Sequence, residues 1–410
     1  MTTAYFFSMP YHGHVNPCLP LIQELTRRGE RVVLYGLETF RRVAEDAGAI
    51  FRPFEYEETE KNIALTTMAA WQMQLVERTL DRLIADAQVD KPAYLLVDYT
   101  CLWGRFLAQH LRIPSVVIHT TYPLTWSEAR LTFRGIRDLF RAPNVCRRLV
   151  TFLLADQRIS RRWDIPRVGL PFKLLRANYG ELHLVLTGME LAHGVEKLDD
   201  RYVFVGPIAR GEGVTAGEPL PKLDSRPLLY VSLGTFWRHS SQIYRACIDA
   251  FGDSDIQVLI TGKDRIAPEV IASLPANIHV CAHVDQIDVL SRCAVFITHG
   301  GMNSVCEALL AEVPMLVYPQ GFDQFGQALF VERSGTGLVL KPRAITSSKL
   351  RELVGRLLQE PDFRARCQQM NRKLRAAGGA TRAADLIMAI RDQRPEAQPS
   401  EYTRPAVASP

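Results

Sequence analysis

The stretch HVDQIDVLSRCAVFITHGGMNSVCEALLAEVPMLVYPQGFDQ, residues 283–324, is the most informative part of this 410-residue chain. Within it the apolar run 294–298 predicts a strand, and THGGMNS predicts a turn that opens a helix near Asn303. A second apolar run follows at 315–318. Strands that alternate with helices in this way are typical of a parallel sheet, so the stretch predicts an α/β fold.

Similar units recur on both sides of this stretch. Short runs rich in β-branched and aromatic residues are each followed by an amphipathic segment of helix length. The predicted strands are 4–8, 31–35, 94–98, 115–119, 182–187 and 202–205 in the first half, and 228–232, 256–261, 278–281, 294–298, 315–318 and 337–340 in the second. Two such series predict two doubly wound, Rossmann-like domains that face each other across a cleft.

The boundary between the two series is predicted from composition. The segment GPIARGEGVTAGEPLPKLD, at 206–224, is rich in Gly and Pro and poor in apolar residues, which is typical of a linker. The expected organisation is an N-terminal domain over 1–208, a linker over 209–224, a C-terminal domain over 225–380, a last helix over 381–392 that packs back on the N-terminal domain, and a polar tail over 393–410.

The composition is that of an ordinary globular protein, with 47% hydrophobic and 23% charged residues. Because neither a long apolar stretch nor an export signal is visible, we expect a cytoplasmic protein without a transmembrane segment. The net charge of +5 is mild, and no aromatic-interleaved basic strip accompanies it, so we expect no nucleic-acid partner. Nine arginines between 130 and 162 are interpreted as solvated helix faces, with a basic rim for an anionic acceptor or a membrane surface as the alternative.

A candidate catalytic pair lies in the first half. His14 follows the first predicted strand, where Gly13 is expected to let the backbone turn tightly, and Asp98 ends the third predicted strand at the same sheet edge. A histidine can accept a proton near neutral pH, and a carboxylate on its other ring nitrogen would orient it. His12 is a competing base, farther from the expected helix start. Purely structural roles for both members of the pair remain the alternative.

The turn at 299–304 has the features of a diphosphate site. Adjacent glycines ending at Gly301 allow a phosphate to approach the backbone, and the helix N-terminus favours an anion without a metal ion or lysine. His299 can donate a further hydrogen bond. Ser304 and Glu307 have capping-box spacing, and a purely capping role is the alternative. The earlier turn VSLGT offers a second patch of backbone N–H groups through Ser232, Gly234 and Thr235.

These segments together resemble the signature of the family of UDP-dependent glycosyltransferases that includes plant secondary-metabolite glucosyltransferases and bacterial macrolide glycosyltransferases. The resemblance covers nearly the full chain, through HGHVNP at 12–17, VFVGP at 203–207, SLGT at 232–235 and the stretch 283–324. It implies the two-domain architecture called GT-B. The nucleotide sugar would bind the C-terminal domain and the acceptor the N-terminal domain.

The resemblance also implies roles for individual residues. His14 would be the base with Asp98 as its partner, while His299, Ser304 and the backbone of Thr235 would lie at the phosphates. The other implied donor contacts are Gln286 to the nucleobase, Glu307 to the ribose, Asn303 on the phosphate and sugar side, and Asp323 and Gln324 to sugar hydroxyls. His283, followed by Val284, replaces the tryptophan that usually stacks on uracil, so the donor base can be uracil or thymine.

The predicted function is therefore an inverting, metal-independent glycosyltransferase. It would move a hexose, expected to be glucose, from a UDP-sugar to a hydroxyl of a small apolar natural product or xenobiotic. The alternatives are an antibiotic glycosyltransferase that uses a dTDP-deoxysugar, a nucleotide-sugar epimerase of the same architecture, and a non-catalytic binding module. We expect no cofactor besides the nucleotide sugar, and a monomer or homodimer.

Two further signals concern the acceptor and a metal ion. Candidates for lining the acceptor site, with core packing as the alternative, are Trp71, Met73, Trp103, Tyr122, Trp126 and Phe133. The sequence Asp253–Ser254–Asp255 resembles the DxD metal site of a different glycosyltransferase architecture. Because it precedes a predicted strand, at the edge away from the cleft, we interpret it as a loop feature.

Overall fold

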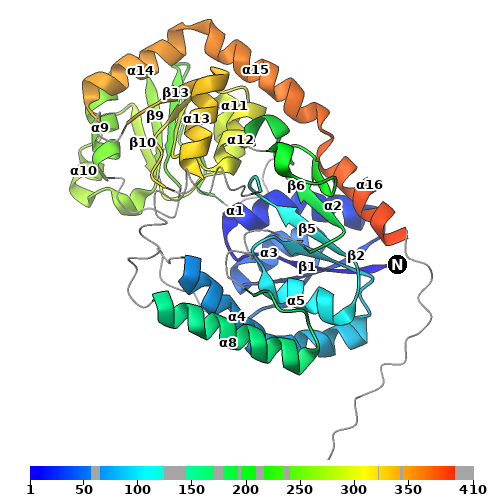
Figure 1. Cartoon of the computed structure of the whole chain (residues 1–410). Coiled ribbons are helices and arrows are strands. Elements are labelled where there is room, and N and C mark those ends of the chain that lie inside the picture. The colour runs from blue at the N-terminus through cyan, green and yellow to red at the C-terminus, as the bar shows by residue number, and fades with distance from the viewer. Residues whose placement is uncertain are drawn as a thin grey trace, which may run out of the picture.

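The computed structural model contains two parallel sheets, one in each half of the chain (Figure 1). It describes residues 1–56, 65–123, 145–169, 179–192, 195–208, 217–234, 241–321, 323–341 and 345–392. The first sheet has the order β3-β2-β1-β4-β5-β6-β7, and its strands are β1 Thr3–Phe7, β2 Arg31–Gly36, β3 Ile50–Pro53, β4 Tyr94–Asp98, β5 Ser115–His119, β6 Leu182–Val185 and β7 Tyr202–Phe204.

Helices cover both faces of this sheet because consecutive side chains of a strand point to opposite sides. Tyr5 and Phe7 of β1 pack with one helix layer, and Ala4 and Phe6 pack with the other. The first layer comprises α4 Leu65–Asp90, α5 Leu102–Leu111 and α8 Val145–Trp163. The second comprises α2 Leu19–Arg27, α3 Arg41–Asp46 and α16 Gly379–Asp392. Both faces of the strands are therefore buried, as in doubly wound folds.

The second sheet is built in the same way, with the order β10-β9-β8-β11-β12-β13. Its strands are β8 Leu228–Ser232, β9 Gln257–Thr261, β10 Ile278–Cys281, β11 Val295–Thr298, β12 Met315–Val317 and β13 Gly337–Val339. One face packs on α11 Gln286–Arg292, α12 Met302–Leu310, α13 Gln324–Ser334 and α15 Pro361–Ala376. The other packs on α9 Ser241–Phe251, α10 Pro268–Ala272 and α14 Ser347–Gln359.

All the predicted strands are confirmed to within two residues at either end, but one strand was missed. β3 is a short edge strand in which only Phe51 is buried, and Pro53 ends it. An edge strand tolerates a proline and needs little apolar sequence because one side has no partner. As a consequence, Asp98 ends the fourth strand of the chain and not the third.

Two helix starts differ in detail from the sequence expectation. Where a tight turn at Gly13 was expected, the chain forms α1 His12–Val15, a 3-10 turn Asn16–Cys18 and then α2. The capping box in α12 does not form, because Gly301 is the N-cap and Ser304 lies inside the first turn. The helical backbone therefore begins already at His12 after β1, and at Met302, directly after the N-cap Gly301, in α12.

The chain passes between the two sheets near Gly206 and returns near Gly379. Gly379 donates its N–H to the carbonyl of Val205, at 2.7 Å. Beyond this point α16 lies against α2 (Figure 1), where Arg28 forms an ion pair with Asp385. The last described helix thus belongs to the core of the first sheet.

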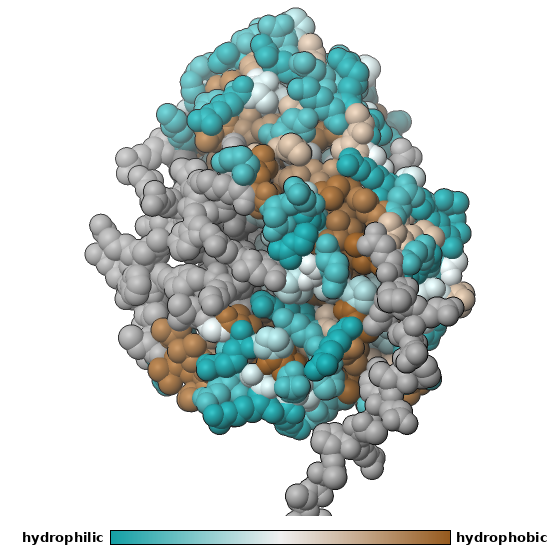
Figure 2. Space-filling view, turned by 45° about the vertical axis from the view of Figure 1, so that its right-hand side comes forward, coloured by the Kyte–Doolittle hydropathy of each residue, from teal (hydrophilic) through white to brown (hydrophobic). Residues whose placement is uncertain are grey.

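The described surface is mixed in character. Figure 2 shows hydrophilic and hydrophobic residues interspersed over the visible face. No helix in the described part of the chain is long and apolar enough to span a membrane.

Candidate active site

A hydrogen-bonded histidine and aspartate lie at the carboxyl end of the first sheet. His14, in α1, and Asp98, the last residue of β4, are joined by a 2.6 Å contact between Nδ1 and Oδ2. The Asp98 side chain is only 1% exposed, whereas that of His14 is 21% exposed. Because an ionised carboxylate can only accept hydrogen bonds, Nδ1 carries the proton, and Nε2 is left with a lone pair. Asp98 thus fixes the orientation of the His14 ring through Nδ1.

Thr100 holds the other oxygen of the same carboxylate. Its hydroxyl and its backbone N–H both donate to Oδ1 of Asp98, at 2.5 and 2.9 Å. Burial by itself raises the pKa of Asp98, but the bonds from His14 and Thr100 outweigh burial and hold this pKa below its usual value. Asp98 is therefore ionised at neutral pH.

The electrostatics of His14 depend on two carboxylates. Burial lowers the pKa of His14, while the charge and hydrogen bond of Asp98 raise it, and the net pKa lies above the usual value. The charge of Asp323, at the start of α13, adds to this rise. Burial raises the pKa of Asp323 itself to about 6. Asp323, at the N-terminus of a helix that packs on the second sheet, therefore raises the pKa of His14 beside the first sheet.

The neighbours of His14 differ from expectation in two ways. Gly13 does not make a tight turn but lies within α1, where its carbonyl accepts a 2.7 Å hydrogen bond from Nδ2 of Asn303. A Cβ at this position would lie 3.5 Å from the same Nδ2, an ordinary van der Waals distance, so the contact does not require a glycine. His12 is the first residue of α1, and its ring faces Phe40 and, at 6.5 Å, His283.

On the second sheet, His299 lies between the two glycine turns. A Cβ at Gly234 would be 2.9 Å from its ring, and one at Gly301 would be 2.5 Å from Nε2, so these glycines make room for the imidazole. Burial lowers the pKa of His299 to about 4, which leaves the ring neutral at neutral pH. Its Nδ1 is buried without a hydrogen-bond partner. Such an unpaired buried nitrogen is suited to a ligand atom.

Three predicted donor residues form one polar cluster beside this turn. Nε2 of Gln286 donates to Glu307, at 2.6 Å, and to Ser304, at 3.4 Å. The hydroxyl of Tyr230 donates to the Gln286 carbonyl oxygen, at 3.4 Å. The structure thus brings together the residues expected at the nucleobase, the ribose and the phosphates.

The remaining donor predictions have different outcomes. Gln324 is buried, and its side-chain oxygen accepts from the N–H groups of Gln320 and Gly321. The side chain of Val284 is part of the hydrophobic core, so only its backbone could reach a ligand. Ser232 ends β8, next to the His299 ring. Thr235 lies outside the described residues.

The predicted acceptor residues are buried wherever the structure describes them. Trp71 is 8% exposed, Met73 and Trp103 are almost fully buried, and all three belong to the core under α4 and α5. Tyr122 reaches the core of the second sheet, and its hydroxyl lies 2.6 Å from the position of a Cβ at Gly326. Their environment is that of core packing, the alternative given above. Trp126 and Phe133 lie outside the described residues.

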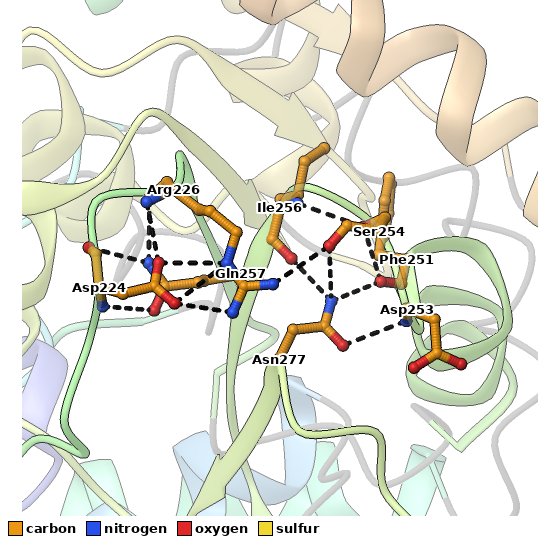
Figure 3. Close-up of polar contacts among 8 residues, drawn as sticks. All are labelled: Asp224, Arg226, Phe251, Asp253, Ser254, Ile256, Gln257 and Asn277. Carbon is orange, nitrogen blue, oxygen red and sulfur yellow. Dashed lines mark hydrogen bonds and ion pairs between the residues drawn. The ribbon is translucent and has the colours of Figure 1, made fainter.

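The DxD-like sequence lies at the opposite end of its sheet, before β9 (Figure 3). There the amide of Asn277 donates to the carbonyls of Phe251 and Ile256, and its oxygen accepts the N–H of Asp253. Backbone groups, and not the Asp253 carboxylate, make these bonds. Among the described residues, no group of three or more His, Cys, Asp or Glu side chains is placed to hold a metal ion.

Two of the five described arginines of the arginine-rich region form ion pairs with α4. Arg158 contacts Glu77 at 2.7 Å and Arg162 contacts Asp81 at 2.6 Å, and both pairs are exposed. These contacts fit solvated helix faces, the first interpretation given above. Arg130, Arg134, Arg137 and Arg141 lie outside the described residues.

Three site residues escaped the sequence analysis: Thr100, Tyr11, and Thr120, whose hydroxyl lies 3.4 Å from Nδ1 of His14. Thr100 had a usable signal, because a threonine two residues after a strand-ending aspartate can bond back to it in an Asx-type turn. Tyr11, whose ring centroid lies 6.0 Å from that of His14, also had a signal, because it lies three residues before His14 in the sequence, whereas its contact with Tyr56 forms only in the folded chain.

The chain is similar to several known glycosyltransferases over almost its whole length. Residues 245–389 match the family model "Erythromycin biosynthesis protein CIII-like, C-terminal domain". The chain is 31% identical to NDP-glycosyltransferase YjiC of Bacillus licheniformis, over 94% of this chain and 96% of that one. It is 28% identical to oleandomycin glycosyltransferase of Streptomyces antibioticus, over 98% and 94% of the two chains.

Solved structures show the same similarity. The crystal structure of the glycotransferase of kitacinnamycin matches with a TM-score of 0.83 and 27% identity, over 95% of this chain and 99% of that one. The calicheamicin glycosyltransferase CalG4 matches with a TM-score of 0.75 and 26% identity, over 96% and 99% of the two chains.

Proposed function

Because this chain belongs to the family of NDP-glycosyltransferases, we propose that it is an inverting hexosyltransferase that uses UDP-glucose and needs no metal ion. Its acceptor is a hydroxyl of a small apolar natural product or xenobiotic. The observation that carries the proposal is the His14–Asp98 pair, next to which Asn303, at the start of α12, donates a hydrogen bond to the Gly13 carbonyl.

In the proposed reaction His14 takes the proton of the acceptor hydroxyl on Nε2. The acceptor oxygen forms a bond to the anomeric carbon while the bond from that carbon to the diphosphate breaks. A single displacement of this kind inverts the anomeric centre. Asp98 stabilises the imidazolium that forms, and the α12 N-terminus with His299 stabilises the charge on the departing diphosphate. The raised pKa of His14 makes it a stronger base than an isolated histidine.

The test is a His14→Ala variant assayed with UDP-glucose and a phenolic or macrolide acceptor, in the presence of a chelator. We expect transfer to fall by about 10²–10⁴, the usual contribution of a general base, with UDP affinity by calorimetry unchanged. His279→Ala, on the edge strand β10, is the matched histidine control and should retain activity. Near-normal transfer by His14→Ala, or a strict requirement for Mg²⁺ or Mn²⁺, would contradict the proposal.

The donor and the product separate the alternatives. His283 in place of a tryptophan allows thymine as well as uracil, so dTDP-glucose is assayed beside UDP-glucose, and a clear preference for dTDP would replace the UDP assignment. Mass spectrometry of the acceptor distinguishes transfer from epimerisation or mere binding. NMR of the anomeric proton of the product tests inversion.

A further inference from the structure

We propose that Tyr11 selects the acceptor by stacking on an aromatic ring, so that the preferred acceptors are phenols. The inference rests on the proposed function, because it places the acceptor hydroxyl at His14. Tyr11 is the N-cap of α1, and its carbonyl accepts the N–H groups of His14 and Val15, at 2.9 and 3.0 Å. The tyrosine and the base are therefore fixed to the same turn.

The ring of Tyr11 is exposed although it is held in place. Tyr11 is 38% exposed, although it lies beside the largely buried His14–Asp98 pair. Its hydroxyl lies 3.1 Å from that of Tyr56, and the two rings are nearly perpendicular, at 85°. The ring of Tyr56 in turn packs on Trp71, with centroids 4.7 Å apart. This arrangement orients Tyr11 and leaves part of its ring available for contact.

A second observation comes from Trp71. Its indole N–H is buried and has no hydrogen-bond partner. Unpaired buried donors are rare in native proteins, and a water or ligand that completes the bond is one explanation for them. The aromatic series thus runs from the exposed ring of Tyr11 through Tyr56 to the buried Trp71, whose indole N–H is unpaired within the core. A flat aromatic molecule matches the exposed ring surface of Tyr11.

The chemistry of the base favours the same class of acceptor. A phenolic hydroxyl has a pKa near 10, like that of tyrosine, so it gives up its proton to an imidazole far more easily than an aliphatic alcohol. A ring lying against Tyr11 would place a hydroxyl at its edge near Nε2 of His14, since the ring centroids of Tyr11 and His14 are 6.0 Å apart. Ring stacking contributes about 0.5–1.5 kcal/mol, which corresponds to roughly a two- to tenfold change in affinity.

The experiment compares two acceptors of equal size, 2-naphthol and its saturated analogue decahydro-2-naphthol, in wild type, Tyr11→Leu and Tyr11→Phe. We expect Tyr11→Leu to raise KM for 2-naphthol about three- to tenfold and to change KM for the saturated alcohol less than twofold. Tyr11→Phe keeps the ring and should restore the KM for 2-naphthol to within about twofold. Calorimetry with UDP shows whether each variant is folded and binds donor.

The outcomes separate this inference from the proposed function. If Tyr11→Leu changes KM equally for both acceptors, or if the saturated alcohol is the better substrate of the wild type, the aromatic assignment is overturned while the transferase remains. If neither acceptor, nor any other phenol or macrolide, gains a hexose with wild type, the proposed function fails.

Discussion

Two oxygens of one carboxylate have different partners in the His14–Asp98 pair. Oδ2 accepts from the imidazole, while Oδ1 accepts from the hydroxyl and the N–H of Thr100. With Oδ1 held, the carboxylate cannot rotate away from the ring. We therefore assign Thr100 as a positioning residue, which acts on the reaction through the basicity of His14.

The prediction at the residue scale concerns Thr100→Val. Loss of the hydroxyl leaves only the backbone N–H of residue 100 on Oδ1, which loosens the orientation of Asp98 and weakens its hold on the imidazole, so the pKa of His14 falls toward its ordinary value. Since the neutral imidazole is the active base, the acid limb of the pH–rate profile should shift to lower pH. A weaker base should also lower kcat several-fold, with the KM for donor unchanged.

The control for this prediction is Thr100→Ser, which keeps the hydroxyl and should restore both the profile and kcat. A merely structural threonine would lower the amount of folded enzyme without moving the acid limb. An unchanged pH profile in Thr100→Val would remove Thr100 from the positioning role.

At the scale of elements, glycines determine how closely segments approach. Gly206, after β7, has φ of +78°, and a Cβ there would lie 2.5 Å from the carbonyl oxygen of Leu374 in α15. Gly355 lies in the middle of α14, where a Cβ would meet nothing within 4 Å. The two positions share a residue type but not a role.

We therefore expect opposite effects from the same substitution. Gly206→Ala should lower the free energy of unfolding by about 1–3 kcal/mol, through the left-handed backbone and the clash with α15. Gly355→Ala should raise it by about 0.5–1 kcal/mol, because alanine favours a helix interior. Urea denaturation of both variants measures the difference. Equal effects would show that the approach at Gly206 is not tight.

At the scale of the whole molecule, α16 joins the end of the chain to the beginning. Ala383, Ala384 and Ile387 are fully buried in the same core as Leu19 and Ile22 of α2. The α15 helix, directly before it, packs instead on the second sheet. The stability of the first sheet therefore depends on residues that follow the second sheet in sequence.

The prediction at this scale is that Ile387→Ala loosens the first sheet. Removing this buried side chain should cost about 2–5 kcal/mol. Hydrogen exchange should show lost protection in β1 and β2, and little change in β8 and β11. Ile243→Ala, a buried isoleucine of α9, is the matched control and should show the reverse pattern. If Ile387→Ala instead lowers hydrogen-exchange protection in β8 and β11, the packing of α16 stabilises the second sheet and the prediction is wrong.

The features that were predicted correctly are those that depend on residues close together in the sequence. Strand β8 was predicted at its true bounds. It is buried on both faces, and such a strand is recognisable in the sequence as a continuous run of apolar residues. Edge strand β3 was not predicted, because a strand with one partner needs little apolar sequence. The capping box at Ser304 was predicted wrongly, because local spacing cannot tell a cap from a first-turn residue that bonds to Gln286 instead.

The sequence by itself determined the two sheets, their carboxyl-edge functional segments and the candidate pair His14 and Asp98, because burial patterns and turn residues act over a few neighbours. Only the tertiary structure decided that Gly13 meets Asn303 and that Tyr11 is exposed beside the base. The contact between Gly13 and Asn303 joins segments far apart in the chain, and the exposure of Tyr11 depends on how the surrounding segments pack. Distances of two to four ångströms are set by how helices and sheets pack, which no local pattern encodes.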